Sequence, residues 1–274
     1  MNFNPEGAIG DAMLNTVGAP AVSQEFSHYP AIPPPASAQV PVRLRVLPEH
    51  ACGYLPDRRA RTRAFYAREM SPEIYHKLMD AGFRRSGRIV YQPACRGCRD
   101  CIQIRIPVET FRPSKSQRRC RRRNQNLRIT IGEPVPDDEA YELYVSYLRE
   151  WFGRDSMNDI GRDSFEAFLY DSPVATIEVR YRDESGRLLA VGLCDVAGQS
   201  LSSMYFFHNP QDRRRGLGTF GVLTEIELAR KMSIPHYYLG YWIRDCSRMS
   251  YKSHFRPYQL LGTDGVWRDM TDSV

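Results

Sequence analysis

The chain has few lysines and no long apolar run. Its lysines are Lys77, Lys115, Lys231 and Lys252, so arginine carries almost all of the basic charge. No stretch approaches the roughly 18 consecutive apolar residues that a membrane-spanning helix needs. The first positive charge is Arg43, and the segment before it lacks the basic start and apolar core of a secretory signal. We therefore expect a cytoplasmic protein without membrane contacts.

The cysteine content argues against a disulfide framework. Seven cysteines are an odd number, and reduced thiols or a metal site fit an intracellular chain better. Three of them share CxxCxxC spacing: Cys95, Cys98 and Cys101. Zinc or an iron–sulfur cluster usually takes a fourth ligand, for which Cys52 is the best candidate, with Cys120 or His50 behind it. A reduced, partly buried turn without metal explains the spacing equally well.

The basic charge is concentrated in one stretch. The chain of 274 residues carries a formal charge of +6 and has a pI near 9.0, which favours an anionic partner. Eight basic residues lie between Arg112 and Arg128, and no acidic residue occurs between Glu109 and Glu133. Arginine pairs bidentately with phosphate, so this run predicts nucleic-acid binding. The alternative is a solvated surface loop. The residues concerned are Arg118, Arg119, Arg121, Arg122 and Arg123.

The pattern of the chain predicts two folded units behind a tail. Residues 1–41 are expected to form a flexible Pro/Ala-rich tail. Residues 42–130 then form a small cysteine- and arginine-rich domain, with a helix over 71–83 capped by Ser71 and strands over 88–94 and 102–108. Residues 131–274 alternate helices and strands. Strands over 174–183, 188–198 and 200–210 predict an antiparallel meander, and 256–262 is expected to be the final strand.

A glycine-containing basic loop opens the longest predicted helix of the second unit. Arg213, Arg215, Gly216 and Gly218 follow a strand and precede a helix. Backbone N–H groups at a helix N-terminus can hold a pyrophosphate, and glycine permits close approach. The succession of strand, loop, long helix, strand, short helix and strand resembles the second half of a GNAT-type acyltransferase domain. In that fold two neighbouring strands separate and the acyl donor lies between them. An ordinary glycine turn is the alternative.

Longer motifs resemble one enzyme family. They are read at Cys52 to Tyr66, Gly82 to Cys98, Phe111 to Asn124, Leu217 to Arg230 and His236 to Pro257. Together they resemble the bacterial leucyl-tRNA–protein transferases, which share a family with the eukaryotic arginyl-tRNA–protein transferases. The resemblance implies an α/β (α+β) chain, with a GNAT-like acyltransferase domain and a smaller N-terminal cysteine-containing domain. It also implies an aminoacyltransferase that moves leucine from Leu-tRNA to proteins with N-terminal Asp or Glu, marking them for degradation as an N-degron.

Eukaryotic members of this family bind zinc or an iron–sulfur cluster through a CxxC and a CC pair. This chain departs from both: Leu55 replaces the second cysteine of the CxxC, and Arg99 follows Cys98. A metal bound by Cys52, Cys95, Cys98 and Cys101 therefore stays an open question. No cofactor beyond aminoacyl-tRNA is expected to be required.

The resemblance also suggests roles for individual residues. The polar candidates for the catalytic cleft are Tyr205, Tyr241, Tyr251 and Asp195. The donor tRNA is expected to contact the glycine loop, the arginine run and Lys252. Arg256, and again Lys252, are candidates for binding the acidic acceptor. Three alternatives remain open: transfer of arginine instead of leucine, a CoA-dependent N-acetyltransferase, and a non-catalytic RNA-binding zinc module. The arginine run favours a tRNA substrate over CoA.

Overall fold

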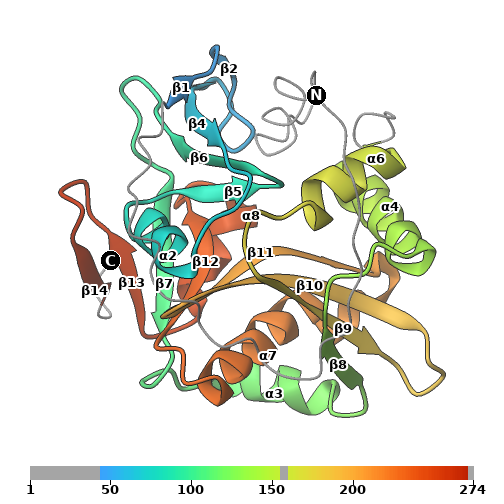
Figure 1. The fold of residues 1–274 in the computed structure, drawn as a ribbon. Helices are drawn as coiled ribbons and strands as arrows, with labels where there is room; N and C mark the ends of the chain where they lie inside the picture. The colour runs from blue at the N-terminus through green and yellow to red at the C-terminus, as the bar shows by residue number, and fades with distance from the viewer. Residues whose placement is uncertain (1–43, 155–159, 271–274) are drawn as a thin grey trace.

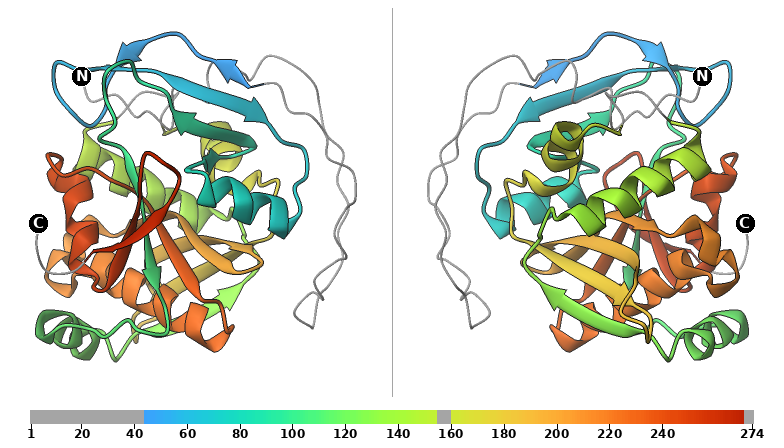
Figure 2. Two further views of the ribbon diagram at one scale, coloured as in Figure 1. Left: turned by 90° about the vertical axis from the view of Figure 1, so that its left-hand side faces the viewer. Right: turned by 90° about the vertical axis from the view of Figure 1, so that its right-hand side faces the viewer.

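The computed structural model describes residues 44–154 and 160–270. The predicted tail at 1–41 lies outside the described residues. Strand pairing gives an eight-stranded sheet, a four-stranded sheet and a two-stranded ribbon. The four-stranded sheet lies above one face of the eight-stranded sheet, and α3 and α7 lie against the other face (Figure 1, Figure 2). Among the helices described, none combines the length and apolar character that a bilayer span requires.

The smaller sheet is built from short strands near the N-terminus. Its order is β1-β4-β6-β5, and β2 and β3 form the separate ribbon. The bounds are β1 Arg45–Val46, β2 His50–Ala51, β3 Arg59–Ala60, β4 Thr62–Tyr66, β5 Arg84–Ser86 and β6 Ile89–Pro93. Helix α2, Pro72–Asp80, lies between β4 and β5. As predicted, the Ser71 hydroxyl caps α2 by accepting from the Ile74 N–H, at 3.3 Å, and Pro72 opens it.

The larger sheet has the order β14-β13-β7-β12-β11-β10-β9-β8. The bounds are β7 Ile102–Pro107, β8 Arg128–Gly132, β9 Thr176–Arg182, β10 Leu188–Ala197, β11 Ser200–His208, β12 His236–Trp242, β13 Tyr258–Leu261 and β14 Trp267–Met270. The predicted meander is confirmed, since β9, β10 and β11 pair antiparallel in sequence. The expected final strand is wrong, because β14 follows β13 and pairs with it.

Strand pairing also differs from the expected division at residue 130. Strand β7 is hydrogen-bonded between β12 and β13, and β8 pairs with β9, so both belong to the larger sheet. Alternation along a strand shows that it is a strand, but it does not identify the partner. By strand pairing, β7 and β8 therefore complete the larger sheet, while the division into domains at residue 130 stays a prediction.

The helices pack on both faces of the larger sheet. Helix α7, Leu217–Lys231, lies against β11 and β12 and buries Leu217, Phe220 and Ile226 in the main core. Each such side chain contributes about 1.5–3 kcal/mol on burial. Helix α3, Lys115–Arg123, packs against α7. The face opposite α3 and α7 carries α4 (Asp138–Phe152), α6 (Arg162–Phe165) and the π-helix Glu166–Tyr170 (Figure 1). Helix α3 contains much of the arginine run, so the segment considered as a surface loop in the sequence analysis is partly helical.

Candidate active site

A gap between β11 and β12 is the central feature of the larger sheet. The two strands pair in parallel only from Ser200 to Ser202, opposite His236 to Tyr238. At that point each strand has a bulge: Met204 is the extra residue on β11 against β10, and Leu239 is the extra residue on β12 against β7. A bulge bends its strand and leaves a ladder N–H unused. Two bulges at the same level explain why the strands separate, as a GNAT-like domain requires.

Arg84 reaches into the start of this gap from the smaller unit. It is buried on β5, and its guanidinium donates to the Ser202 hydroxyl and to the Ser203 carbonyl, each at 2.6 Å. Gly240 makes room on the β12 side: a methyl group there would lie 3.2 Å from the guanidinium carbon, and its φ is +81°. The smaller unit therefore adds a buried positive charge to a site made otherwise from the larger sheet.

Asp195, a predicted cleft residue, is a buried structural carboxylate. Both of its oxygens accept from Arg85, at 2.5 and 2.7 Å, and neither side chain is exposed to solvent. The hydroxyls of Tyr75, at 3.0 Å, and Thr176, at 2.9 Å, donate to the same carboxylate. With four donors already present, the carboxylate joins β10 to the smaller unit and does not face a substrate. Its predicted catalytic role stays a prediction, and the contacts in the structure assign it a structural one.

The three predicted tyrosines lie in different surroundings. Tyr241 is buried, and its hydroxyl donates to the Gly82 carbonyl at 2.9 Å, which fixes β12 to the smaller unit. The ring of Tyr205 packs in an aromatic cluster against Tyr144 and Phe168. Tyr251 is 38% exposed overall. Burial of its phenol, together with the nearby charge of Glu225, raises the pKa of Tyr251 to about 12, so the hydroxyl stays protonated. Of the three, Tyr251 is the most exposed, and the catalytic roles of all three stay predictions.

The predicted phosphate loop is a 3₁₀ turn, η2, that leads into α7. It spans Pro210–Arg215, and Gly216 connects it to α7 in the left-handed region, with φ +66°. No side chain among the described residues caps α7, so its first N–H groups face outward. Gly218 has open space around it: a methyl group there would meet nothing within 4 Å. This end of α7 retains the properties of an anion site.

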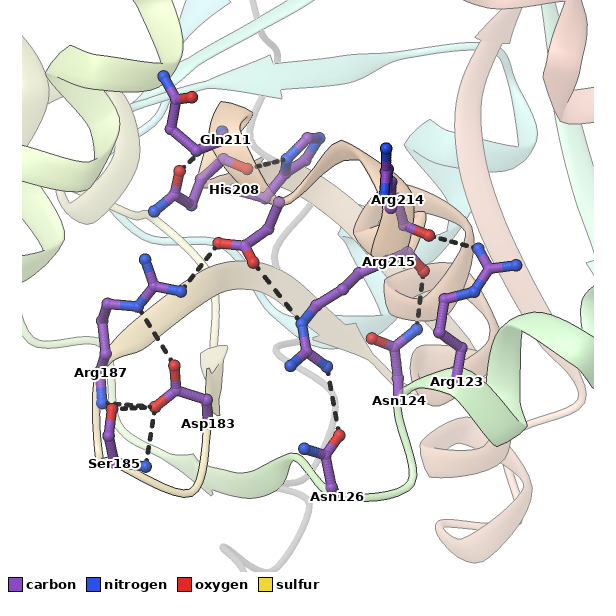
Figure 3. A network of polar contacts seen from close by, with 12 residues as sticks. Arg123, Asn124, Asn126, Asp183, Ser185, Arg187, His208, Gln211, Arg214 and Arg215 are labelled. Atoms are coloured by element: carbon purple, nitrogen blue, oxygen red, sulfur yellow. Dashed lines mark hydrogen bonds and ion pairs between the residues drawn. The ribbon is translucent and has the colours of Figure 1, made fainter.

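Helix α3 holds this loop in place (Figure 3). The Arg123 guanidinium donates to the Arg214 carbonyl, and the Asn124 amide donates to the Arg215 carbonyl at 2.8 Å. Arg215 itself donates to the Asn126 side chain at 3.2 Å and pairs with Asp212 at 3.6 Å. The buried thiol of Cys120 also donates to this loop, with its sulfur 3.4 Å from the Gly216 carbonyl oxygen. It therefore supports the loop and does not act as a metal ligand beside the other cysteines. Arg123 and Arg215 therefore act first as supports of the loop.

The remaining arginines of α3 form an exposed basic face. Lys115, Arg118, Arg119 and Arg122 line a surface hollow of about 310 Å³. Ser114 begins the helix with a capping box to Gln117, which is buried and also donates to the His254 carbonyl at 3.0 Å. Arg121 lies 3.9 Å from Glu227 of α7. The side of α3 that carries Gln117 and Cys120 is therefore buried, and the basic side chains lie together on the surface.

The two basic residues predicted near the acceptor site differ in exposure. Lys252 is buried, and its ammonium donates to the Tyr241 carbonyl at 2.8 Å, so it ties the 3₁₀ turn η3 (Tyr251–His254) to β12. The predicted role of Lys252 in binding RNA or acceptor stays a prediction, since its ammonium is engaged within the protein in the structure. Arg256 is exposed, with its guanidinium 6.0 Å from the ring centre of Tyr258. Its predicted role toward an acidic acceptor stays a prediction.

Glu225 is an ionisable residue beneath the gap that sequence reasoning missed. It is fully buried on α7 and accepts from the Tyr237 hydroxyl of β12 at 2.5 Å. Its second oxygen has no hydrogen-bond partner among the described residues and lies 2.6 Å from where a methyl group of Gly192 would stand. Burial raises the pKa of Glu225 to about 7, although the bond from Tyr237 opposes the shift. Its spacing from the buried Leu217 and Gly221, at i+4 and i+8, was the available signal.

Comparison with known proteins identifies the family. Among solved structures, L-PGS from Bacillus licheniformis is 14% identical with a TM-score of 0.42, covering 66% of this chain and 52% of that one. The aspartate/glutamate leucyltransferase of Saccharophagus degradans is 39% identical over 77% of this chain and 90% of its own length. That of Stenotrophomonas maltophilia (strain R551-3) is 40% identical over 85% and 95%. Family models for the N terminus and C terminus of arginine-tRNA-protein transferase match residues 50–119 and 139–262. The chain belongs to this family.

The four cysteines predicted as metal ligands in this arginine-tRNA-protein transferase family member are free, half-buried thiols. Among residues 44–154 and 160–270, no three His, Cys, Asp or Glu side chains are placed to hold a metal ion. The Cys95 sulfur accepts from the Arg61 N–H at 3.4 Å, and the Cys98 thiol donates to Asp100 at 3.3 Å. Burial raises the pKa of the Cys101 thiol, and the neighbouring Cys95, Cys52 and Cys98 raise it further. A metal bound by these four cysteines stays a prediction.

The transferase site thus combines predicted and unpredicted parts. The loop before α7 and the exposed basic face of α3 were expected from the sequence, and their roles in binding tRNA stay predictions. Arg84 was missed because its motif, Gly82 to Cys98, lies in another sheet, and no local pattern shows that β5 faces β11. Asp195 and Lys252 were selected as polar residues in the right segment. The partner of Asp195 is Arg85, which is distant in sequence, and that of Lys252 is the Tyr241 carbonyl on the preceding strand.

Proposed function

We propose that the protein transfers leucine from Leu-tRNA to the α-amine of proteins that begin with Asp or Glu. The observation that carries the proposal is the gap between β11 and β12, with an uncapped helix N-terminus and an arginine surface beside it. Relatives about 40% identical over most of their length carry the name aspartate/glutamate leucyltransferase. We place the reaction in the cytoplasm, where charged tRNA is used, with no cofactor besides aminoacyl-tRNA.

In this proposal the aminoacyl ester lies in the gap and the acceptor amine attacks its carbonyl carbon. A C–N bond forms, the ester C–O bond breaks, and the 3′-terminal oxygen of the tRNA leaves as a hydroxyl with the proton that the amine gives up. The ester is already activated, so positioning supplies much of the rate. An α-amine has a pKa near 8, so only a modest base is needed. The bulge at Met204 offers backbone N–H groups for the oxyanion.

The acceptor side of the proposal rests on positive charge near the gap. Arg84 brings a guanidinium to its start, and Arg256 is exposed on the segment that follows η3. An arginine fork pairs well with the carboxylate of an N-terminal Asp or Glu. The donor side rests on the α3 face and the α7 N-terminus, which suit the phosphates of a polynucleotide.

The test is transfer of radiolabel from leucyl-tRNA and from arginyl-tRNA to peptides beginning with Asp, Glu, Arg or Lys. We expect labelled Asp and Glu peptides from leucyl-tRNA alone. Label from arginyl-tRNA on the same peptides would support the arginine alternative. Acetylation of the peptides by acetyl-CoA, without transfer from either tRNA, would overturn the assignment to tRNA-dependent chemistry.

A further inference from the structure

An exposed aromatic cluster lies where α4 ends beside the loop that enters α7. Trp151 is 47% exposed on the last turn of α4. Its ring centre lies 5.6 Å from that of His208, the last residue of β11, and 6.5 Å from that of Tyr147. The Arg213 guanidinium lies over the indole ring, 5.3 Å from its centre. The indole of Trp151 is largely exposed and has a cation over it. Packing of the hydrophobic core does not explain this arrangement.

The position of this cluster is fixed from several elements. The Tyr147 ring also packs edge-on against Phe152 and against His208, and Gln211 of η2 donates to both carboxylate oxygens of Glu150 on α4 at 2.9 Å. The indole is therefore held against the loop as part of a rigid arrangement. Figure 3 shows His208 and Gln211 at the start of the same loop whose end is supported by α3.

In the proposed function the donor tRNA approaches the gap along the end of β11, and Trp151 lies beside that end through its contact with His208. The gap opens along β11 from Tyr205 toward His208, a distance of about 10 Å at the usual rise of a strand. An ester in the gap places the 3′-terminal nucleotides beside His208, and the phosphates beside the α7 N-terminus and α3. The 3′ end of a tRNA is single-stranded, so its bases are free to stack on aromatic rings and guanidinium planes.

We infer that Trp151, with Arg213 and His208, forms a stacking site for an unpaired base at the 3′ end of the donor tRNA. The inference rests on the proposed function and adds a subsite to it. Charge favours this occupant over an apolar side chain of the acceptor, because Arg213 and the neighbouring basic loop surround the indole. The base would stack on the indole while the adjoining phosphates contact the loop.

The test compares Trp151→Ala and Trp151→Phe with wild type in binding uncharged tRNA, both intact and with its unpaired 3′-terminal nucleotides removed. Stacking of one base contributes about 1–3 kcal/mol, so Trp151→Ala should weaken binding of intact tRNA by about 5- to 150-fold. Trp151→Phe should bind nearly as wild type does. The shortened tRNA should bind wild type and Trp151→Ala equally. Tyr66→Ala, which removes an exposed ring from β4, is the matched control and should bind both tRNAs normally.

Three outcomes would overturn the inference. The first is binding of intact tRNA to Trp151→Ala as tight as to wild type. The second is an equal loss of affinity for the shortened tRNA, which would indicate an indirect effect on the loop. The third is a raised peptide KM with constant tRNA affinity, which would make the cluster an acceptor site. The first two outcomes need only a wild-type protein that binds tRNA, and the third also needs one that transfers leucine. A wild-type protein that does not bind or use tRNA would instead contradict the proposed function.

Discussion

Single buried charges connect the two units, and the pair between Arg85 and Asp195 is the clearest example. Replacing Asp195 by alanine leaves the guanidinium of Arg85 buried without its carboxylate. Breaking a buried pair in this way costs about 3–5 kcal/mol. We expect Asp195→Ala to lower the free energy of unfolding by that amount, measured by urea denaturation. Arg85→Ala should cost a similar amount, and the double variant less than the sum. An Asp195→Ala protein that is as stable as wild type but inactive would support the predicted catalytic role of Asp195.

Glu225 predicts a pH dependence of stability. Its carboxyl has a pKa of about 7 in the folded protein against an ordinary 4.5, so the folded state holds the proton that the unfolded state has lost. Stability is therefore lost as pH rises from about 4.5 to about 7, by up to about 3 kcal/mol. Glu225→Gln should gain stability relative to wild type over this range, measured by thermal or urea unfolding. Glu227→Gln, on the exposed side of the same helix, is the control. A constant difference between Glu225→Gln and wild type would contradict the assignment.

At the scale of elements, α3 combines support of the loop with a basic face. Reversing Arg119 and Arg122 to glutamate should weaken tRNA binding, and each lost phosphate contact should reduce the log–log salt slope by about one unit or slightly less. Turnover at saturating tRNA should change little. Binding is measured at several salt concentrations, with Arg58→Glu, exposed between β2 and β3, as the control. An unchanged slope would make this face a solvated surface.

At the scale of the whole molecule, the order of strands in the sheet decides which segments fold together. A fragment of residues 131–274 lacks β7, which pairs with both β12 and β13, and it lacks α3 and most of β8. It would expose the edges of two strands and the α3-facing side of α7. We therefore expect no cooperative thermal transition by circular dichroism, whereas the full chain shows one. Cooperative melting of the fragment would support the division at residue 130.

The sequence by itself determined the elements and the family. Caps, alternation and glycines are local signals, so α2, the meander of β9 to β11 and the loop before α7 could be predicted, and the long motifs identified the chemistry. The tertiary structure alone decided partners. The placement of Arg84 in the strand gap and the burial of Asp195 depend on contacts between segments far apart in the chain. The burial of Glu225 and the exposure of Trp151 likewise depend on how the helices pack on the sheet. Hydrogen bonding and burial are set by those contacts, and residue type reveals neither.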